Sequence, residues 1–123
     1  MLAFVVDDSR AMRSIMKGLL KDLGYDTIDA VDGKDALRVL AASPKPDVML
    51  IDWNMPEMNG FELMLAVRDN PAYEDVPLLM VTTENEMDMV VKALGAGANE
   101  YIMKPFDREI VREKLQILGL KVA

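Results

Sequence analysis

The chain has 123 residues, of which 51 % are hydrophobic and 28 % are charged, so length and composition predict one globular domain. It contains neither cysteine nor histidine, which excludes disulfides, thiolate metal sites and phosphohistidine and removes the usual general base. The formal net charge of −7 disfavours nucleic acids and anionic membranes as partners, and no apolar run is long enough to cross a bilayer.

Short apolar runs alternate with amphipathic segments along the chain. The predicted strands are 2–6, 27–30, 48–51, 77–81 and 99–103. Apolar residues recur at helical spacing over 12–23, 36–41, 61–68, 87–94 and 110–118. Gly24 is placed to close the first helix, Gly95 and Gly97 to close the fourth, and Asp107 to cap the last.

Strand-helix alternation repeated five times predicts an α/β fold in which helices cover both faces of a parallel sheet. The runs at 48–51 and 78–81 are apolar throughout, which is typical of central parallel strands buried on both faces. The last helix ends close to the end of the sequence. We therefore expect 1–123 to form a single domain, with no output domain attached.

Polar and charged side chains follow four of the predicted strands. They are Asp7 and Asp8 after the first strand, Asp52 after the third, Thr82 and Thr83 after the fourth, and Lys104 after the fifth. Taken alone, an aspartate at a strand end is usually a helix N-cap, and a Lys-Pro pair is usually a turn. Because the carboxyl ends of parallel strands share one edge of the sheet, we expect these groups to converge there.

Clustered carboxylates repel one another unless a cation compensates them or they share a proton. With no histidine or cysteine available, the ligands are all oxygen atoms, which suits Mg²⁺ and also allows Mn²⁺. A carboxylate beside such a metal, a lysine and a threonine hydroxyl can act as a nucleophile toward a phosphoryl group. The cluster therefore predicts metal-assisted phosphoryl transfer.

Six segments, in this order and spacing, resemble the receiver domains of two-component response regulators, in particular the stand-alone chemotaxis receivers of the CheY type. They are Val5-Val6-Asp7-Asp8-Ser9, Asp52-Trp53-Asn54-Met55-Pro56, Gly60, Met80-Val81-Thr82, Gly95-Ala96-Gly97-Ala98 and Lys104-Pro105-Phe106. The resemblance covers nearly the whole chain. It implies a flavodoxin-like, doubly wound, five-stranded parallel sheet of order 2-1-3-4-5, with five helices in three layers.

The resemblance also implies the roles of the acidic residues. Asp52 would accept the phosphoryl group as an acyl phosphate. Asp8 and Asp52 would hold Mg²⁺ by their carboxylates and Asn54 by its backbone carbonyl, while Asp7 would act mainly through a water molecule on the metal.

The same resemblance implies a switch. Lys104 would pair with the phosphate, Thr82 would move to hydrogen-bond it, and Tyr101 would turn inward behind Thr82; without the family, Tyr101 reads as a half-buried strand aromatic. Lys104-Pro105 matches a cis peptide in the family. Asn54 and Glu84 resemble the residues of fast-resetting CheY proteins, which implies a short-lived phosphorylated state.

The implied function is that of a phosphorylation-activated response regulator, a signalling protein that assists its own phosphorylation and dephosphorylation and is not otherwise an enzyme. Its partners would be a CheA-like sensor histidine kinase, a FliM-like flagellar motor switch protein and a phosphatase. The target would bind the face built by 87–94, 99–103 and 110–118. Its composition suits a partner surface, since Met87, Met89 and Val91 cannot all point inward from one helix. Since no basic segment precedes an apolar one at the N-terminus, we predict no signal peptide and expect a cytoplasmic monomer.

Three alternatives remain at this point. The chain could be a single-domain receiver that shuttles or drains phosphate in another phosphorelay. A haloacid-dehalogenase-type phosphatase also uses an aspartyl nucleophile with Mg²⁺, but it needs a second acid where this chain has Asn54. A flavodoxin would bind its phosphate after the first strand, where Asp7 and Asp8 would repel it.

Overall fold

The computed structural model describes residues 1–83 and 87–123, in which strands and helices alternate as predicted. The strands are β1 (Leu2–Val6), β2 (Asp26–Ala30), β3 (Val48–Asp52), β4 (Leu78–Thr82) and β5 (Glu100–Met103). The helices are α1 (Arg10–Asp22), α2 (Gly33–Ala41), α3 (Gly60–Asp69), α4 (Met87–Ala96) and α5 (Arg108–Ile117), with a short 3₁₀ helix, η1 (Pro71–Tyr73), before β4. The strands pair in parallel in the order β2-β1-β3-β4-β5, which confirms the predicted fold.

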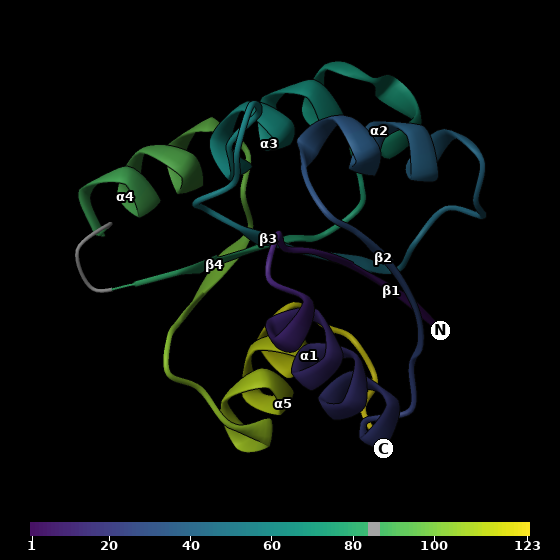
Figure 1. The fold of residues 1–123 in the computed structure, drawn as a ribbon. Helices are drawn as coiled ribbons and strands as arrows, with labels where there is room; N and C mark the ends of the chain where they lie inside the picture. The colour runs from purple at the N-terminus through teal and green to yellow at the C-terminus, as the bar shows by residue number, and fades with distance from the viewer. Residues whose placement is uncertain (84–86) are drawn as a thin grey trace.

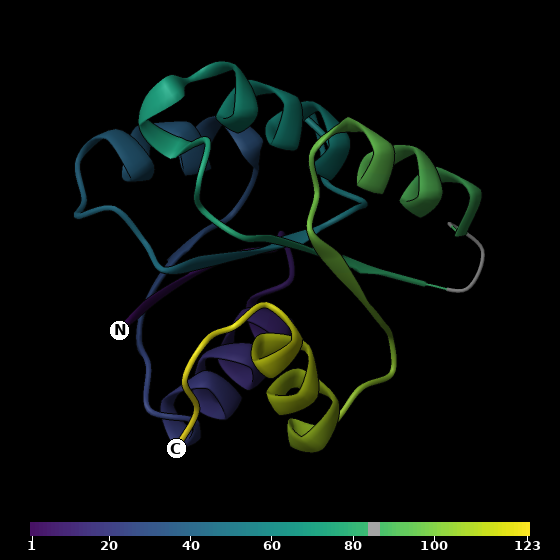
Figure 2. The same ribbon diagram turned by 180° about the vertical axis from the view of Figure 1, so that it is seen from behind.

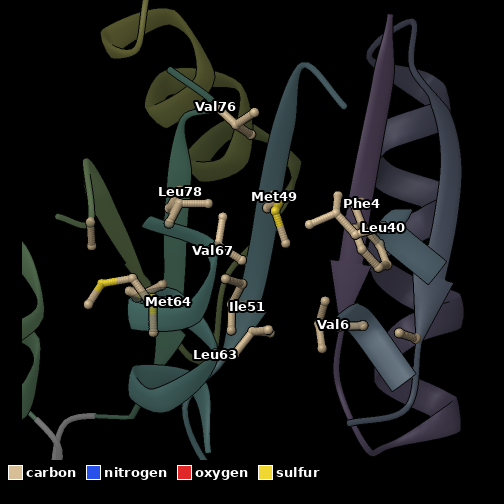
Figure 3. Packing of buried hydrophobic residues seen from close by; sticks show 14 of the residues in the cluster. Phe4, Val6, Leu40, Met49, Ile51, Leu63, Met64, Val67, Val76 and Leu78 are labelled. Carbon is tan, nitrogen blue, oxygen red and sulfur yellow. The ribbon is translucent and has the colours of Figure 1, made fainter. Parts of the chain in front are cut away.

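The helices form one layer on each side of the sheet. α1 and α5 cover one face, and α2, α3 and α4 cover the other (Figures 1 and 2). Successive side chains along a strand point to opposite faces, so Phe4 and Val6 pack under α2 and α3 while Ala3 and Val5 pack against α1. Figure 3 shows the first of these two clusters, where strand side chains such as Met49 and Ile51 lie with helix side chains such as Leu63.

The two central strands are the most deeply buried part of the fold. Every residue of β3 and β4 is buried, because both faces of the sheet are covered there. Their continuous apolar runs end in polar residues, Asp52 in β3 and Thr82 in β4, which are buried at the edge of the sheet. The candidate site is therefore positioned by buried strands whose last residues are polar.

The boundaries of β4 and α4 differ slightly from the prediction. β4 begins at Leu78 because Pro77 has no N–H to donate, and the side-chain oxygen of Asn99 accepts the hydrogen bond from Leu78 N. Gly95 lies inside α4 and does not close it. Gly97 follows the helix with a φ of 134°, a conformation that favours glycine.

Among the described helices, α1, α2, α3 and α5 begin at side-chain caps, and the cap of α2 is Asp32, whose carboxylate accepts a hydrogen bond from Asp35 N at 2.8 Å. Ser9 caps α1, Asn59 caps α3 in a capping box with Glu62, and Asp107 caps α5 as predicted. The simple interpretation of Asp52 as a cap is therefore wrong, and Ser9 takes the role that Asp8 would have had. Within the described residues, no helix is both long and apolar enough to span a membrane.

Candidate functional site

Backbone hydrogen bonds between neighbouring strands hold the strand ends together at one edge of the sheet. Asp7 N donates to the carbonyl of Ala30 at 3.2 Å, and Lys104 N donates to the carbonyl of Thr82 at 2.7 Å. The N–H of Trp53, directly after Asp52, donates to Val81 O at 3.0 Å. The polar residues that follow β1, β3, β4 and β5 therefore meet at this edge, as the sequence predicted.

Three carboxylates form the centre of the site. Asp7, Asp8 and Asp52 each offer an oxygen that lies within 4.8 Å of the others. Asp7 and Asp52 are buried, with 1 % and 6 % of their surface exposed, whereas Asp8 is exposed at the mouth of the cluster. Asp7 Oδ1 accepts a hydrogen bond from Ser9 N at 2.8 Å, which fixes the orientation of the carboxylate.

Lys104 supplies the positive charge inside this cluster. Its Nζ lies 2.8 Å from Asp52 Oδ1 and 3.7 Å from Asp7 Oδ2. Burial raises the pKa of Asp52 to about 6, and the negative charges of Asp7 and Asp8 act in the same direction against the hydrogen bond from Lys104. One ammonium group therefore compensates three carboxylates only in part.

The donor set fits a hard divalent cation. Asp7 Oδ2 is buried and has no hydrogen-bond partner among the described residues. An unpartnered buried carboxylate oxygen is costly unless a cation or a proton satisfies it. Because the converging ligands are all carboxylate oxygens and the mouth is open at Asp8, the site suits Mg²⁺, which prefers oxygen ligands and keeps part of its water shell.

The predicted switch residues lie next to the cluster. Thr82 is buried, and its hydroxyl donates to the carbonyl of Thr83 at 3.3 Å. Tyr101 is half-buried on β5, where Lys114 Nζ lies 4.5 Å from the centre of its ring. Asn54 is exposed two residues after Asp52, and the peptide bond between Lys104 and Pro105 is cis, as the resemblance implied. Glu84, the other predicted tuning residue, lies outside the described residues.

Sequence reasoning missed one residue that supports the site. A terminal nitrogen of Arg13 donates to the backbone carbonyl of Asp7 at 2.8 Å, and its Nε donates to Asp29 Oδ2 at 3.1 Å. The arginine therefore ties α1 to the ends of β1 and β2. Helical spacing does not single out Arg13, because its partners come from other elements.

Apolar side chains are exposed on α4, near the site. Val91 is 66 % exposed, Met89 is 42 % exposed and Leu94 is 37 % exposed, whereas Met87 is half-buried. This confirms that the apolar residues of this helix do not all point inward. Apolar side chains exposed together on one helix are typical of a surface that a partner covers.

Comparisons with known proteins agree with this geometry. Residues 3–116 match the response regulator receiver domain family. The chain is 47 % identical over 121 residues to a CheY homologue of Campylobacter jejuni, covering 97 % of this chain and 93 % of that protein. It is 44 % identical over 119 residues to chemotaxis protein CheY1 of Helicobacter pylori, covering 96 % of each chain. Among solved structures, the chemotaxis response regulator CheY4 of Vibrio cholerae superimposes with a TM-score of 0.86 at 37 % identity, covering 95 % of this chain and 97 % of that one.

The chain therefore belongs to the response regulator receiver family. The match decides against the phosphatase and flavodoxin alternatives. Because the curated relatives are CheY chemotaxis proteins over nearly their full length, the chain is a receiver domain of the CheY chemotaxis type.

Proposed function

We propose that this chain is a phosphorylation-activated response regulator that accepts a phosphoryl group from a sensor histidine kinase onto Asp52. The observation that carries the proposal is the buried Asp52 carboxylate, which lies among two other carboxylates and within 2.8 Å of Lys104 Nζ. Such a carboxylate is suited to accept a phosphoryl group, because a bound metal and the Lys104 ammonium can compensate the negative charge of that group.

The transfer balances as a simple displacement. A carboxylate oxygen of Asp52 attacks the phosphorus of a phosphohistidine on the kinase, the new O–P bond forms, and the P–N bond breaks. The leaving imidazole takes a proton from solvent. Lys104 offsets charge on the phosphoryl oxygens, and the Thr82 hydroxyl donates a hydrogen bond to one of them. Mg²⁺, which Asp7, Asp8, Asp52 and the Asn54 carbonyl would hold, supplies positive charge beside these oxygens when bound.

Signalling would follow from a movement of Thr82. In the described structure its hydroxyl donates to the Thr83 carbonyl, so the side chain must turn to reach a phosphoryl group on Asp52. We infer that Tyr101 then moves inward behind Thr82, which changes the face formed by α4, β5 and α5. Phosphorylation stabilises that second arrangement because only there is the new negative charge fully hydrogen-bonded.

The partners follow from the chemotaxis relatives. We propose a CheA-like kinase as donor and a FliM-like flagellar motor switch protein as the target of the α4-β5-α5 face, in the cytoplasm. Met89 and Val91 give this face exposed apolar contacts. Asn54 and Glu84 would set how fast water removes the phosphoryl group, with a phosphatase accelerating the reset.

Phosphorylation is tested by intact-mass analysis after incubation with a small acyl phosphate and Mg²⁺. We expect a gain of one phosphoryl group, located at Asp52 by peptide mapping. Asp52→Asn should show no gain, while Asp69→Asn, an exposed carboxylate on α3, should behave as the unchanged chain does. An adduct that persists in Asp52→Asn would overturn the assignment.

Trp53 reports on the site without a label. Because it directly follows Asp52 and is 4 % exposed, its fluorescence should change on addition of Mg²⁺ and again on addition of beryllofluoride, a phosphoryl mimic.

The target protein is tested by measuring the binding of a motor switch peptide with and without the mimic. Binding that depends on the mimic supports motor control, whereas phosphotransfer to a histidine phosphotransfer domain without peptide binding supports the phosphate-shuttle alternative.

A further inference from the structure

A second, basic site lies beside α1. A surface pocket of about 270 Å³ is lined by Arg10, Arg13, Ser14 and Lys17 of α1 and by Asp29 of β2. The four helical residues have the spacing i, i+3, i+4 and i+7, which places them on one side of the helix. α1 packs against β2, the strand at the edge of the sheet (Figure 1). The residues that line the pocket come from these two elements, so it forms between them.

The pocket carries positive charge on an acidic protein. Three cationic side chains line it against one carboxylate, which leaves a formal charge of 3 − 1 = +2, while the whole chain carries −7. The exposed side chain of Arg10 has no hydrogen bond or ion pair within the described residues. Lys17 Nζ lies 3.6 Å from Asp29 Oδ1 and its side chain is 39 % exposed, so its ammonium can turn toward a ligand.

Arg13 is already oriented for binding. Its side chain is only 14 % exposed, and two of its donors are held, one by Asp29 Oδ2 and one by the carbonyl of Asp7. A guanidinium has five N–H donors, so the others remain for a ligand. Asp29 therefore acts as a positioning residue that holds Arg13 in place, in the way that a supporting carboxylate orients an arginine.

We propose that this pocket binds the phosphoryl group of a small phosphomonoester. The Arg10 guanidinium, the remaining donors of Arg13, a lysine and the Ser14 hydroxyl match the oxygens of a dianion. A charge of +2 is balanced by a phosphomonoester but not by a single carboxylate. At ~30 Å³ for each water, the space corresponds to about nine water molecules, which leaves room for a short polyol body.

This pocket adjoins the carboxylate cluster through the hydrogen bond from Arg13 to the Asp7 carbonyl, but none of the three clustered carboxylates lines it, and the proposal does not depend on the proposed function. The test is a titration of ¹⁵N-labelled protein with glycerol 3-phosphate, without Mg²⁺ so that the acidic cluster repels the anion. Sodium chloride at matched ionic strength and glycerol serve as control ligands. We expect saturable shifts of the amides of Arg10, Arg13, Ser14, Lys17 and Asp29, with a millimolar dissociation constant.

Arg10→Ala removes a side chain without a partner in the described structure, so it should leave the fold intact and weaken binding about tenfold. Lys34→Ala is the matched control: Lys34 is exposed on α2, on the opposite side of the sheet, and should change nothing. Shifts that do not saturate, that sodium chloride reproduces, or that persist unchanged in Arg10→Ala would overturn the proposal. A failure to detect phosphorylation at Asp52 would not contradict the proposal for this pocket.

Discussion

Lys104 Nζ lies 2.8 Å from Asp52 Oδ1, although the two residues follow strands that are not neighbours in the sheet. Asp52 ends β3, Lys104 follows β5, and β4 lies between them. The contact therefore depends on the arrangement of three strands and not on local sequence. It makes the lysine sensitive to any change at Asp52, whether a proton, a metal or a phosphoryl group.

Lys104→Met tests this contact. Loss of one charge-assisted hydrogen bond, worth ~1.5–3 kcal/mol, should slow phosphorylation by a small acyl phosphate about 10- to 100-fold. Removing the ammonium also removes a cause that lowers the pKa of Asp52, so that pKa should rise further. The test compares initial rates of phosphorylation, measured by intact mass, in Lys104→Met and in the control variant Lys121→Met. Lys121 is an exposed residue near the C-terminus. Equal rates in the two variants would show that Lys104 takes no part in the transfer.

Asp52→Asn should make the unliganded protein more stable at neutral pH. The folded-state pKa of Asp52 is about 6, raised by burial from an ordinary value of 3.8, so ionisation favours the unfolded chain. This carboxyl adds no penalty well below pH 3.8, where it is protonated in both states; the penalty grows between pH 3.8 and about 6 and is fully present above that. We expect a gain of about 1–3 kcal/mol at pH 7, reduced by the loss of a charged partner for Lys104.

Urea denaturation in the presence of a chelator measures this gain at pH 7 and at pH 4. The difference in unfolding free energy between Asp52→Asn and the unchanged chain should be much smaller at the lower pH, which lies close to the ordinary pKa of 3.8. A variant that is less stable at pH 7 would mean that the Lys104 contact outweighs the cost of burying the carboxylate.

Asp7→Asn tests the metal site through a carboxylate oxygen whose ion-pair partner is the Lys104 ammonium at 3.7 Å. Asp7 Oδ2 is buried without a hydrogen-bond partner in the described structure, and an amide offers less charge to a cation. We expect Mg²⁺ affinity to fall about 10- to 100-fold, measured by Trp53 fluorescence and by the Mg²⁺-dependent rise in melting temperature. Asp69→Asn should leave both unchanged. Undiminished affinity in Asp7→Asn would exclude this residue from the metal site.

The acidic cluster could be predicted from sequence for a specific physical reason. Each buried strand reads as an apolar run, and the polar residue that ends it must lie at the carboxyl edge of a parallel sheet. Asp7, Asp52, Thr82 and Lys104 all follow this rule. Their convergence needed only the fold class, because it comes from backbone topology.

The basic pocket could not be predicted in this way. Arg13 and Lys17 are ordinary charged positions of an amphipathic helix, and only the packing of α1 against β2 brings them to Asp29. The start of β4 was missed partly for a similar reason, since the Asn99 side chain that pairs with Leu78 comes from the turn between α4 and β5. Side-chain partners from distant elements are not encoded in local periodicity.

A pair of glycine substitutions separates a glycine that the site requires from one that it does not. A Cβ on Gly60 would collide with the carbonyl oxygen of Asp52 and lie 3.0 Å from Cα of Trp53, and backbone atoms cannot move aside cheaply. Gly60→Ala should therefore destabilise the fold by at least ~1–3 kcal/mol and, by displacing Asp52, weaken the Mg²⁺ response of Trp53 fluorescence. Gly95→Ala, inside α4 with nothing within 4 Å, should instead stabilise by ~0.5–1 kcal/mol and leave the Mg²⁺ response unchanged. Urea denaturation and Mg²⁺ titration of both variants provide the comparison. A Gly60→Ala protein of normal stability would show that the backbone between β3 and α3 can shift to accommodate a Cβ at this position.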